Sequence, residues 1–207
     1  MPRRLAWTVL LGGSLVVAVL AIVVTHTDLL GGLDRAVAQW AYDHSTASTH
    51  RGLTYVTDLG ETWTVLLVAI LVSLVDLVRR GSFWTLPFLL LVILGDKLLT
   101  QELKQLVGRA RPTFEPVAAT LGPSFPSGHS STAAASWAAF ALVAGLWWGR
   151  RSLPWLAGLA VGIAVAVAAS RVFLGVHWLT DVIGGLALGW AWFAACALAL
   201  PRAIRRA

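Results

Sequence analysis

The sequence predicts an all-α fold, a bundle of six transmembrane helices, because it is poor in charge and its apolar residues form long runs. Hydrophobic residues make up 57% of the 207-residue chain, charged residues make up 13%, and the mean hydropathy is +0.76, which is far more apolar than a soluble domain. A helix crosses the roughly 30 Å hydrocarbon layer with about 20 apolar residues. Such runs lie at about 5–25, 62–79, 82–103, 130–149, 153–171 and 176–200. We expect them to form one integral-membrane domain over residues 1–207.

The first two runs each carry a feature that bears on this prediction. The first follows a basic start, as a signal peptide does, but it is about 20 residues long and lacks a convincing cleavage site. We expect it to be retained as a helix. In the second run, Asp76 lies four residues before Arg80, a spacing that brings helical neighbours together. We interpret Asp76 as a paired charge at the membrane boundary.

Charges also crowd the third run, where Asp96 and Lys97 lie inside the apolar stretch. A lone ammonium at this depth costs about 2.5–3.5 kcal/mol on insertion scales. Lys97 should therefore face the bundle interior and pair with a carboxylate, and Glu61, at the start of the second run, is a plausible partner. Two interpretations stay open for Lys97: a place beneath a phosphate pocket, or a structural pair between helices.

Basic residues predict the orientation. Nine of them lie at alternate ends of the six runs: Arg3, Arg4, Arg79, Arg80, Arg150, Arg151, Arg202, Arg205 and Arg206. By the positive-inside rule these ends are cytoplasmic. The opposite ends carry seven basic residues, three of which are the candidate phosphate-binding residues described below. We expect a multi-pass protein of the cell (inner) membrane, with both termini cytoplasmic and all three clusters outside.

The net charge of +6 and the isoelectric point near 10.7 raise the question of nucleic acid as a partner. The cations are spread as arginine pairs over short loops rather than gathered into a stripe, so membrane anchoring explains them better and we expect no nucleic acid partner. A single cysteine, Cys196, lies in the last run. It allows no disulfide and no thiolate metal site within the chain.

The longest polar connection covers about residues 26–60 and carries apolar residues at helical spacing from Leu33 to Ala41. This pattern predicts one short helix lying in the membrane interface. His26, His44 and His50 share the connection, but no two of them have the i, i+4 spacing of a helical metal site. We interpret them as solvated or interfacial side chains.

The first polar cluster runs from Lys104 to Arg111 and Pro112 at the outer end of the third run. Seven residues are nearly two helical turns, so Lys104 and Arg111 can share a face, while Gly108 and Pro112 help to bring the chain out of the helix. Arginine offers a planar fork for two phosphate oxygens and lysine a compact charge. The alternative is a pair of cations that extend to the headgroups.

The second cluster, Pro126-Ser127-Gly128-His129, stands directly before the fourth run. A helix that begins near Ser127 points free N–H groups and the positive end of its dipole outward, which favours an anion. Gly128 lets a ligand approach the backbone, and His129 supplies an imidazole in the first turn. The alternative is an ordinary serine N-cap followed by a tolerated histidine.

The third cluster runs from Ser170-Arg171 through His177 to Asp181. On a helix, Asp181 lies on the same face as His177 and can hold one ring nitrogen while the other faces a substrate. A nucleophile oriented by a neighbour is the arrangement of covalent catalysis. The alternative is a structural His–Asp pair. Together the clusters supply cations, backbone N–H groups, two histidines and a carboxylate, which phosphoryl transfer needs.

These motifs match in full the three-part signature Lys-x6-Arg-Pro, Pro-Ser-Gly-His and Ser-Arg-x5-His-x3-Asp of the type 2 phosphatidic acid phosphatases, and the chain resembles this PAP2 superfamily over about residues 97–190. The resemblance implies a PAP2/haloperoxidase-like core. It implies His177 as a nucleophile that forms a phosphohistidine, His129 as the acid that protonates the leaving group, and Asp181 as the residue that orients His177. The implied phosphate-binding residues are Lys104, Arg111, Ser127, Gly128 and Arg171. No metal or other cofactor is implied, and Glu115, the best spare carboxylate, is isolated.

The expected function is hydrolysis of a lipid phosphomonoester or lipid diphosphate, such as phosphatidic acid, phosphatidylglycerophosphate or undecaprenyl pyrophosphate. A lipid phosphotransferase that uses the same phosphohistidine is an alternative. A non-enzymatic protein that binds or transports lipid phosphates is another, but it gives no role to His129 or to the spacing of His177 and Asp181. The soluble haloperoxidases that share the signature do not have six apolar runs.

Overall fold

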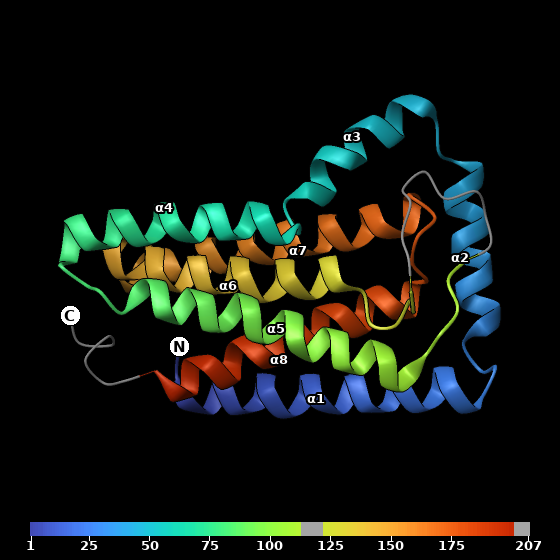
Figure 1. The fold of residues 1–207 in the computed structure, drawn as a ribbon, viewed down its shortest axis with the longest axis horizontal. Coiled ribbons are helices and arrows are strands. Elements are labelled where there is room, and N and C mark those ends of the chain that lie inside the picture. Colours follow the sequence, from blue (N-terminus) through green and yellow to red (C-terminus); the bar gives the residue numbers. More distant parts are fainter. Residues whose placement is uncertain (113–121, 201–207) are drawn as a thin grey trace.

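The computed structural model describes residues 1–112 and 122–200, and within these ranges every regular element is helical. The helices are α1 (Arg3–His26), α2 (Gly31–Asp43), α3 (Ala47–Asp58), α4 (Thr62–Arg80), α5 (Thr85–Val107), α6 (Gly128–Trp148), α7 (Leu153–Phe173) and α8 (Leu179–Ala199), with a short 3₁₀ turn, η1 (Arg150–Ser152), before α7. The six longer helices run along one direction, and α2 and α3 lie at one end of this bundle (Figure 1).

All six predicted runs are helices, with ends shifted by a few residues. Five of them, α1, α4, α6, α7 and α8, are long and apolar enough to cross a membrane. The all-helical membrane fold is therefore confirmed. The remaining long helix, α5, carries Asp96, Lys97 and Glu102 within its apolar stretch and does not meet this criterion. That α5 also spans the membrane therefore stays a prediction. Three of the arginines used for the orientation, Arg202, Arg205 and Arg206, lie outside the described residues.

The centre of the bundle is α6, which packs against α4, α5, α7 and α8. Its buried face is built from small side chains. A Cβ atom on Gly189 of α8 would lie 2.2 Å from the backbone oxygen of Ser131, and one on Gly185 would lie 2.5 Å from the backbone oxygen of Ser127. Only glycine permits this approach, as expected of close helix packing in membranes. It places the start of α6 directly against the start of α8.

The predicted pairing of Asp76 with Arg80 is confirmed, with 3.5 Å between Oδ1 and Nη1. The carboxylate is nevertheless fully buried rather than at a solvated boundary. It accepts hydrogen bonds from Trp147 Nε1 at 2.7 Å and from the hydroxyl of Thr85. Asp76 therefore ties α4 to α5 and α6.

The prediction for Lys97 is wrong. Asp96 is the residue that faces the interior, where it is fully buried and accepts hydrogen bonds from two hydroxyls of α6. Successive residues of a helix point about 100° apart, so Lys97 is turned outward. It is exposed and its Nζ lies 3.4 Å from Thr62 Oγ1, whereas Glu61 pairs with a histidine described below.

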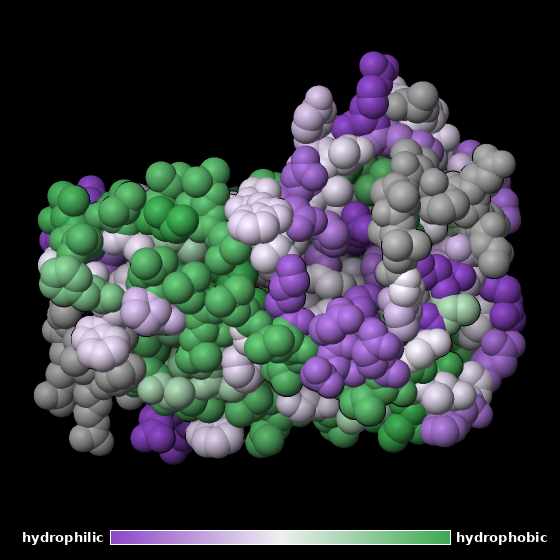
Figure 2. Space-filling model, in the orientation of Figure 1, coloured by the Kyte–Doolittle hydropathy of each residue, from purple (hydrophilic) through white to green (hydrophobic). Residues whose placement is uncertain are grey.

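The connection over residues 26–60 forms two helices where one was predicted. The expected one is α2, which buries Asp34, Ala38 and Ala41 against the bundle. The second, α3, begins where Thr46 Oγ1 accepts a hydrogen bond from the Thr49 backbone N–H at 3.1 Å, the usual N-cap contact, and it packs on α7. Hydrophobic side chains cover much of the side of the bundle, and hydrophilic ones gather toward the end with α2 and α3 (Figure 2).

Candidate active site

The three polar clusters meet at the end of the bundle that carries α2 and α3 (Figure 1). The first cluster follows α5, which ends at Gly108 with φ of +62°, a left-handed conformation that glycine adopts readily. The second begins α6, and the third spans the turn between α7 and α8. The prediction that the clusters share one end is therefore confirmed.

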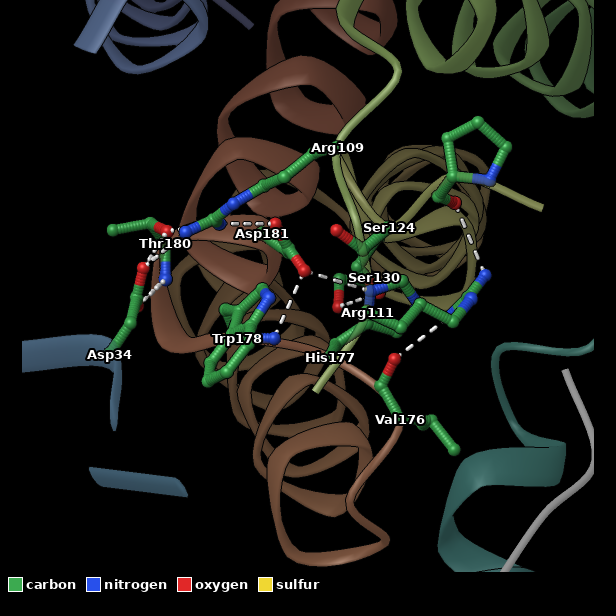
Figure 3. A network of polar contacts seen from close by, with 12 residues as sticks. Asp34, Arg109, Arg111, Ser124, Ser130, Val176, His177, Trp178, Thr180 and Asp181 are labelled. Atoms are coloured by element: carbon green, nitrogen blue, oxygen red, sulfur yellow. Dashed lines mark hydrogen bonds and ion pairs between the residues drawn. The ribbon is translucent and has the colours of Figure 1, made fainter. Parts of the chain in front are cut away.

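His177 is 3% exposed, and its two ring nitrogens have different neighbours (Figure 3). Nδ1 lies 3.3 Å from Asp181 Oδ2, and Nε2 lies 3.3 Å from Nη1 of Arg111. Because a carboxylate only accepts, we assign the ring proton to Nδ1 and a lone pair to Nε2. Burial lowers the pKa of His177 to about 4, and the nearby Arg111 charge acts in the same direction, whereas Asp181 opposes it. The imidazole is therefore neutral at physiological pH.

The expectation that His177 and Asp181 share a helical face is wrong in its geometry, although the pair exists. α8 begins at Leu179, so His177 precedes the helix. The pair forms because Asp181, in the first turn of α8, points back along the chain. Its Oδ2 accepts a hydrogen bond from the Trp178 backbone N–H at 2.9 Å and also faces His177.

A second group of residues, which the sequence analysis missed, holds the other oxygen of Asp181 (Figure 3). Arg109 Nη1 donates to Asp181 Oδ1 at 2.6 Å and to Thr180 Oγ1 at 2.7 Å, and Nη2 donates to Asp34 Oδ2 at 2.6 Å. Asp34 also accepts from the Thr180 backbone N–H at 2.9 Å and from its hydroxyl at 2.6 Å. Asp34 is 75 or more residues from these partners in sequence, so no local spacing could indicate the contact.

Lys104 and Arg111 converge as predicted. Lys104 Nζ lies 2.8 Å from the backbone oxygen of Pro123, and Arg111 Nη2 lies 3.2 Å from the same oxygen. Arg111 lies beyond the end of α5, so the two side chains meet through the turn at Gly108 and not through a shared helical face. The N–H groups of Lys104 and Arg111 thus donate to backbone carbonyl oxygens of Gly122–Ser124. A bound anion could accept these hydrogen bonds instead.

Arg171, the third predicted cation, is 3% exposed near the end of α7. Its Nη1 donates to Thr57 Oγ1 of α3 at 2.9 Å, whereas its buried Nε has no hydrogen-bond partner among the described residues. Its charge interacts with those of Lys104 and Arg111, so the three cations lie near one another. A buried donor without a partner is costly, and an anion would satisfy it.

The second cluster begins α6 as predicted, with Ser127 as N-cap residue. The Ser127 hydroxyl makes no capping contact and instead accepts from Ser130 Oγ at 2.9 Å. A Cβ on Gly128 would meet no backbone. His129 Nε2 lies 3.0 Å from Oε2 of Glu61, a partner that the sequence analysis assigned to Lys97. The side chains of this pair are 27% and 43% exposed.

Metal ligands do not cluster in the described parts of the chain. Within residues 1–112 and 122–200, no three His, Cys, Asp or Glu side chains are placed to hold one ion. Cys196 is buried in α8, and Glu115 lies outside the described residues. Metal-free chemistry stays a prediction, to be tested by chelation.

Comparisons with known proteins agree with the fold and the motifs. The family model described as "PAP2 superfamily" matches residues 85–205. The chain is 34% identical over 171 residues to phosphatidylglycerophosphatase B of Bacillus subtilis, covering 79% of this chain and 81% of that relative. It is 36% identical over 120 residues to a lipid A 1-phosphatase of Rhizobium johnstonii, covering 53% and 45% of the two chains.

A solved structure gives the same answer. The crystal structure described as the first transmembrane PAP2 type phosphatidylglycerolphosphate phosphatase from Bacillus subtilis superimposes with a TM-score of 0.86 at 32% identity, and the match covers 92% of this chain and 94% of that one. The relatives are named phosphatases, so the predicted class of enzyme, a phosphoric ester hydrolase, is confirmed. Fold, motifs and relatives together show that the chain belongs to the PAP2 superfamily.

Proposed function

We propose that the protein is a membrane lipid phosphatase that works through a phosphohistidine on His177. The observation that supports this most directly is the unequal surroundings of the His177 ring. Asp181 holds Nδ1, and Nε2 faces Arg111, one of three cations that lie near one another. A neutral imidazole whose Nε2 lone pair faces these cations is arranged to attack a phosphorus atom bound among them.

The first chemical step transfers the phosphoryl group to the histidine. The Nε2 lone pair of His177 forms the N–P bond while the P–O bond to the leaving oxygen breaks. The substrate anion offsets the charges of Lys104, Arg111 and Arg171 that act on His129. His129 therefore takes up a proton when the substrate binds and donates it to the leaving oxygen. Glu61, 3.0 Å from His129 Nε2, stabilises the protonated imidazole and orients the ring.

The second step returns the enzyme to its starting state. Neutral His129 accepts a proton from water, and the water oxygen attacks phosphorus. The N–P bond breaks, its electron pair returns to Nε2 of His177, and inorganic phosphate leaves. His129 is protonated again, so protons and bonds balance over the cycle.

Side-chain cations neutralise the phosphoryl group in this proposal. Arg111 and Arg171 present forks that match phosphate oxygens, and Lys104 adds a compact charge. Among the described residues, Arg171 Nε has no partner and can donate to these oxygens. Lys104 and Arg111 can exchange their backbone carbonyl partners for phosphate oxygens. Ser127 and Gly128 add a hydroxyl and the backbone N–H groups at the start of α6.

The substrate is a lipid phosphate whose tail stays in the bilayer. The site lies at the end of a bundle of apolar helices, which suits a headgroup at the membrane surface. Phosphatidylglycerophosphate is the first candidate, because the relative that matches 79% of this chain is named for it. Phosphatidic acid and undecaprenyl pyrophosphate are the other candidates.

The proposed topology places the site outside the cell membrane and both termini inside. It makes α5 a sixth span, since its 23 residues reach about 34 Å at 1.5 Å per residue and it packs beside α4, α6 and α8. With the buried Cys196 as the natural cysteine, Ser48→Cys on α3 should react with a membrane-impermeant thiol reagent in intact cells, and Ser152→Cys should not. The opposite pattern would place the chemistry in the cytoplasm.

Phosphate release from purified lipid phosphates in detergent tests the activity. We expect release from at least one candidate by the wild-type protein and none by His177→Ala. Incubation with an added lipid or alcohol acceptor separates hydrolysis from transfer, because a phosphotransferase would label the acceptor. Turnover by His177→Ala would overturn the mechanism.

A further inference from the structure

A buried ionic cluster lies behind the His177–Asp181 pair, on the side away from Arg111 (Figure 3). It consists of Asp34, Arg109, Thr180 and Asp181. Asp34, Thr180 and Asp181 are at most 2% exposed, and the Arg109 side chain is 14% exposed. The elements that meet here are α2, the segment after α5, and the start of α8.

Arg109 is the centre of this cluster, and its shape explains why an arginine stands there. One guanidinium contacts Asp181, Thr180 and Asp34 at 2.6 to 2.7 Å. Its carbon also lies 5.7 Å from the ring centre of Trp178, within the range of a cation–π contact. A planar fork holds two carboxylates in fixed positions, which a lysine ammonium cannot do with the same geometry.

The charges of the cluster do not cancel. Two carboxylates, Asp34 and Asp181, share the one guanidinium of Arg109, which leaves a formal charge of −1 beside the His177 ring. When Nε2 gains a phosphoryl group and Nδ1 keeps its proton, the ring becomes cationic. The cluster and the ring then sum to zero. In a buried site this compensation favours the phosphorylated ring over the free one.

We propose that Arg109 and Asp34 are positioning residues of the reaction: Arg109 aims Asp181 at Nδ1 of His177, and Asp34 supplies the negative charge that stabilises the phosphohistidine. The inference depends on the proposed role of His177 as nucleophile. It also gives α2 a part in catalysis, because Asp34 is the residue through which that helix reaches the site.

The charged groups that face His177 make the test specific. Asp181 of α8, Arg111 after α5 and Lys104 of α5 act on the ring directly, and Arg109 and Asp34 lie behind Asp181. Asp34→Asn removes one negative charge and should move the acid limb of kcat/KM to lower pH. Arg109→Gln removes one positive charge and should move it to higher pH. We expect each shift to be about one pH unit.

The rate should respond together with the pH profile. Asp34→Asn and Arg109→Gln should lower kcat by about 10–100-fold, the range for residues that orient a reactive histidine in metal sites, with KM nearly unchanged because neither residue touches the substrate. Arg109→Lys should restore the position of the acid limb but only part of kcat. The matched controls are Asp28→Asn, which alters an exposed carboxylate before α2, and Arg51→Gln, which alters an exposed arginine of α3. Both should behave as wild type.

Several outcomes would overturn the inference. If Asp34→Asn and Arg109→Gln change the thermal stability but not the pH profile, the cluster is purely structural. If both variants shift the acid limb in the same direction, the charge argument fails. If Arg109→Gln does not fold, Asp34→Asn carries the test alone, since asparagine has the shape of aspartate, although its amide accepts fewer of the three hydrogen bonds that Asp34 accepts. His177→Ala, measured in parallel, separates the two proposals. An active His177→Ala protein refutes the mechanism itself. If His177→Ala is inactive but Asp34→Asn and Arg109→Gln leave the acid limb of kcat/KM unshifted, only the role of the cluster is refuted.

Discussion

The two histidines of the site stand in opposite environments. His177 is 3% exposed and is held by the fully buried Asp181, which in turn is held by Arg109. His129 is 27% exposed at the start of α6 and is held by Glu61, which is 43% exposed and caps the start of α4. One imidazole is enclosed by a network, and the other stands at the edge of the site with Glu61 as its side-chain partner among the described residues.

This difference fits the two chemical tasks that we propose for these histidines. A nucleophile must keep one nitrogen unprotonated and aimed at phosphorus, so rigidity and burial serve it. A group that gives a proton in one step and takes one in the next must reach the substrate and water. The family motif contains both histidines, and the surroundings in the folded protein distinguish them.

The strongest way to break the comparison is to remove each histidine in turn. His177→Ala should abolish turnover, because no neighbouring side chain replaces a covalent nucleophile. Samples of wild-type enzyme quenched in alkaline detergent, which preserves the acid-labile P–N bond, should contain phosphorylated protein, and those of His177→Ala should contain none. Phosphorylated protein in the His177→Ala sample would contradict the assignment of His177 as the nucleophile and favour His129 in that role.

His129→Ala should lower turnover by about 10²–10⁴-fold, the usual contribution of a general acid. The loss should be smaller for a lipid diphosphate than for a phosphomonoester, since a phosphate leaving group needs less protonation than an alkoxide. Steady-state kinetics with both substrates checks this. An equal loss with both would contradict proton donation to the leaving group.

Glu61→Gln should lower kcat by about tenfold, the low end of the range for residues that orient a histidine. The alkaline limb of the pH profile should move to lower pH, because the imidazolium of His129 loses its counter-charge. Asp58→Asn, which alters an exposed carboxylate three residues earlier, is the matched control. A normal pH profile in Glu61→Gln would reduce Glu61 to a helix cap.

The pH dependence sharpens the comparison on the His177 side. Burial holds the pKa of His177 near 4, so its nucleophilic form persists down to about that pH, whereas an ordinary histidine is half protonated near pH 6.5. Between these values the unfolded chain binds more protons, so the free energy of unfolding should fall as the pH falls from about 6.5 to 4. An acid limb of kcat/KM near 6.5 that follows His177 would contradict its burial.

Chelation should have the smallest effect. EDTA should leave activity unchanged, because Lys104, Arg111 and Arg171 supply the positive charge. Vanadate, which adopts a five-coordinate geometry like that of the transferring phosphoryl group, should inhibit. Loss of activity in EDTA that Mg²⁺ restores would show that these cations are not sufficient.

The amino-acid sequence determined the all-helical membrane fold, the six long helices and the position of three motifs at their ends. These features are local: a helix needs a run of apolar residues, and each motif spans twelve residues or fewer. The shared end of the three clusters could also be predicted, because successive membrane runs alternate in direction and the clusters fall at ends on the same side. Sequence alone was therefore sufficient to predict the family and the class of enzyme.

Only the tertiary structure decided which residues support the site. Arg109 was one more outer cation in the sequence, and it contacts Asp34 and Asp181, which are 75 and 72 residues away. Glu61 met His129 instead of Lys97 because Lys97 points away from the bundle interior. Spacing along a chain predicts neighbours within one or two helical turns. Contacts between distant segments depend on how the helices pack and on which way each side chain points.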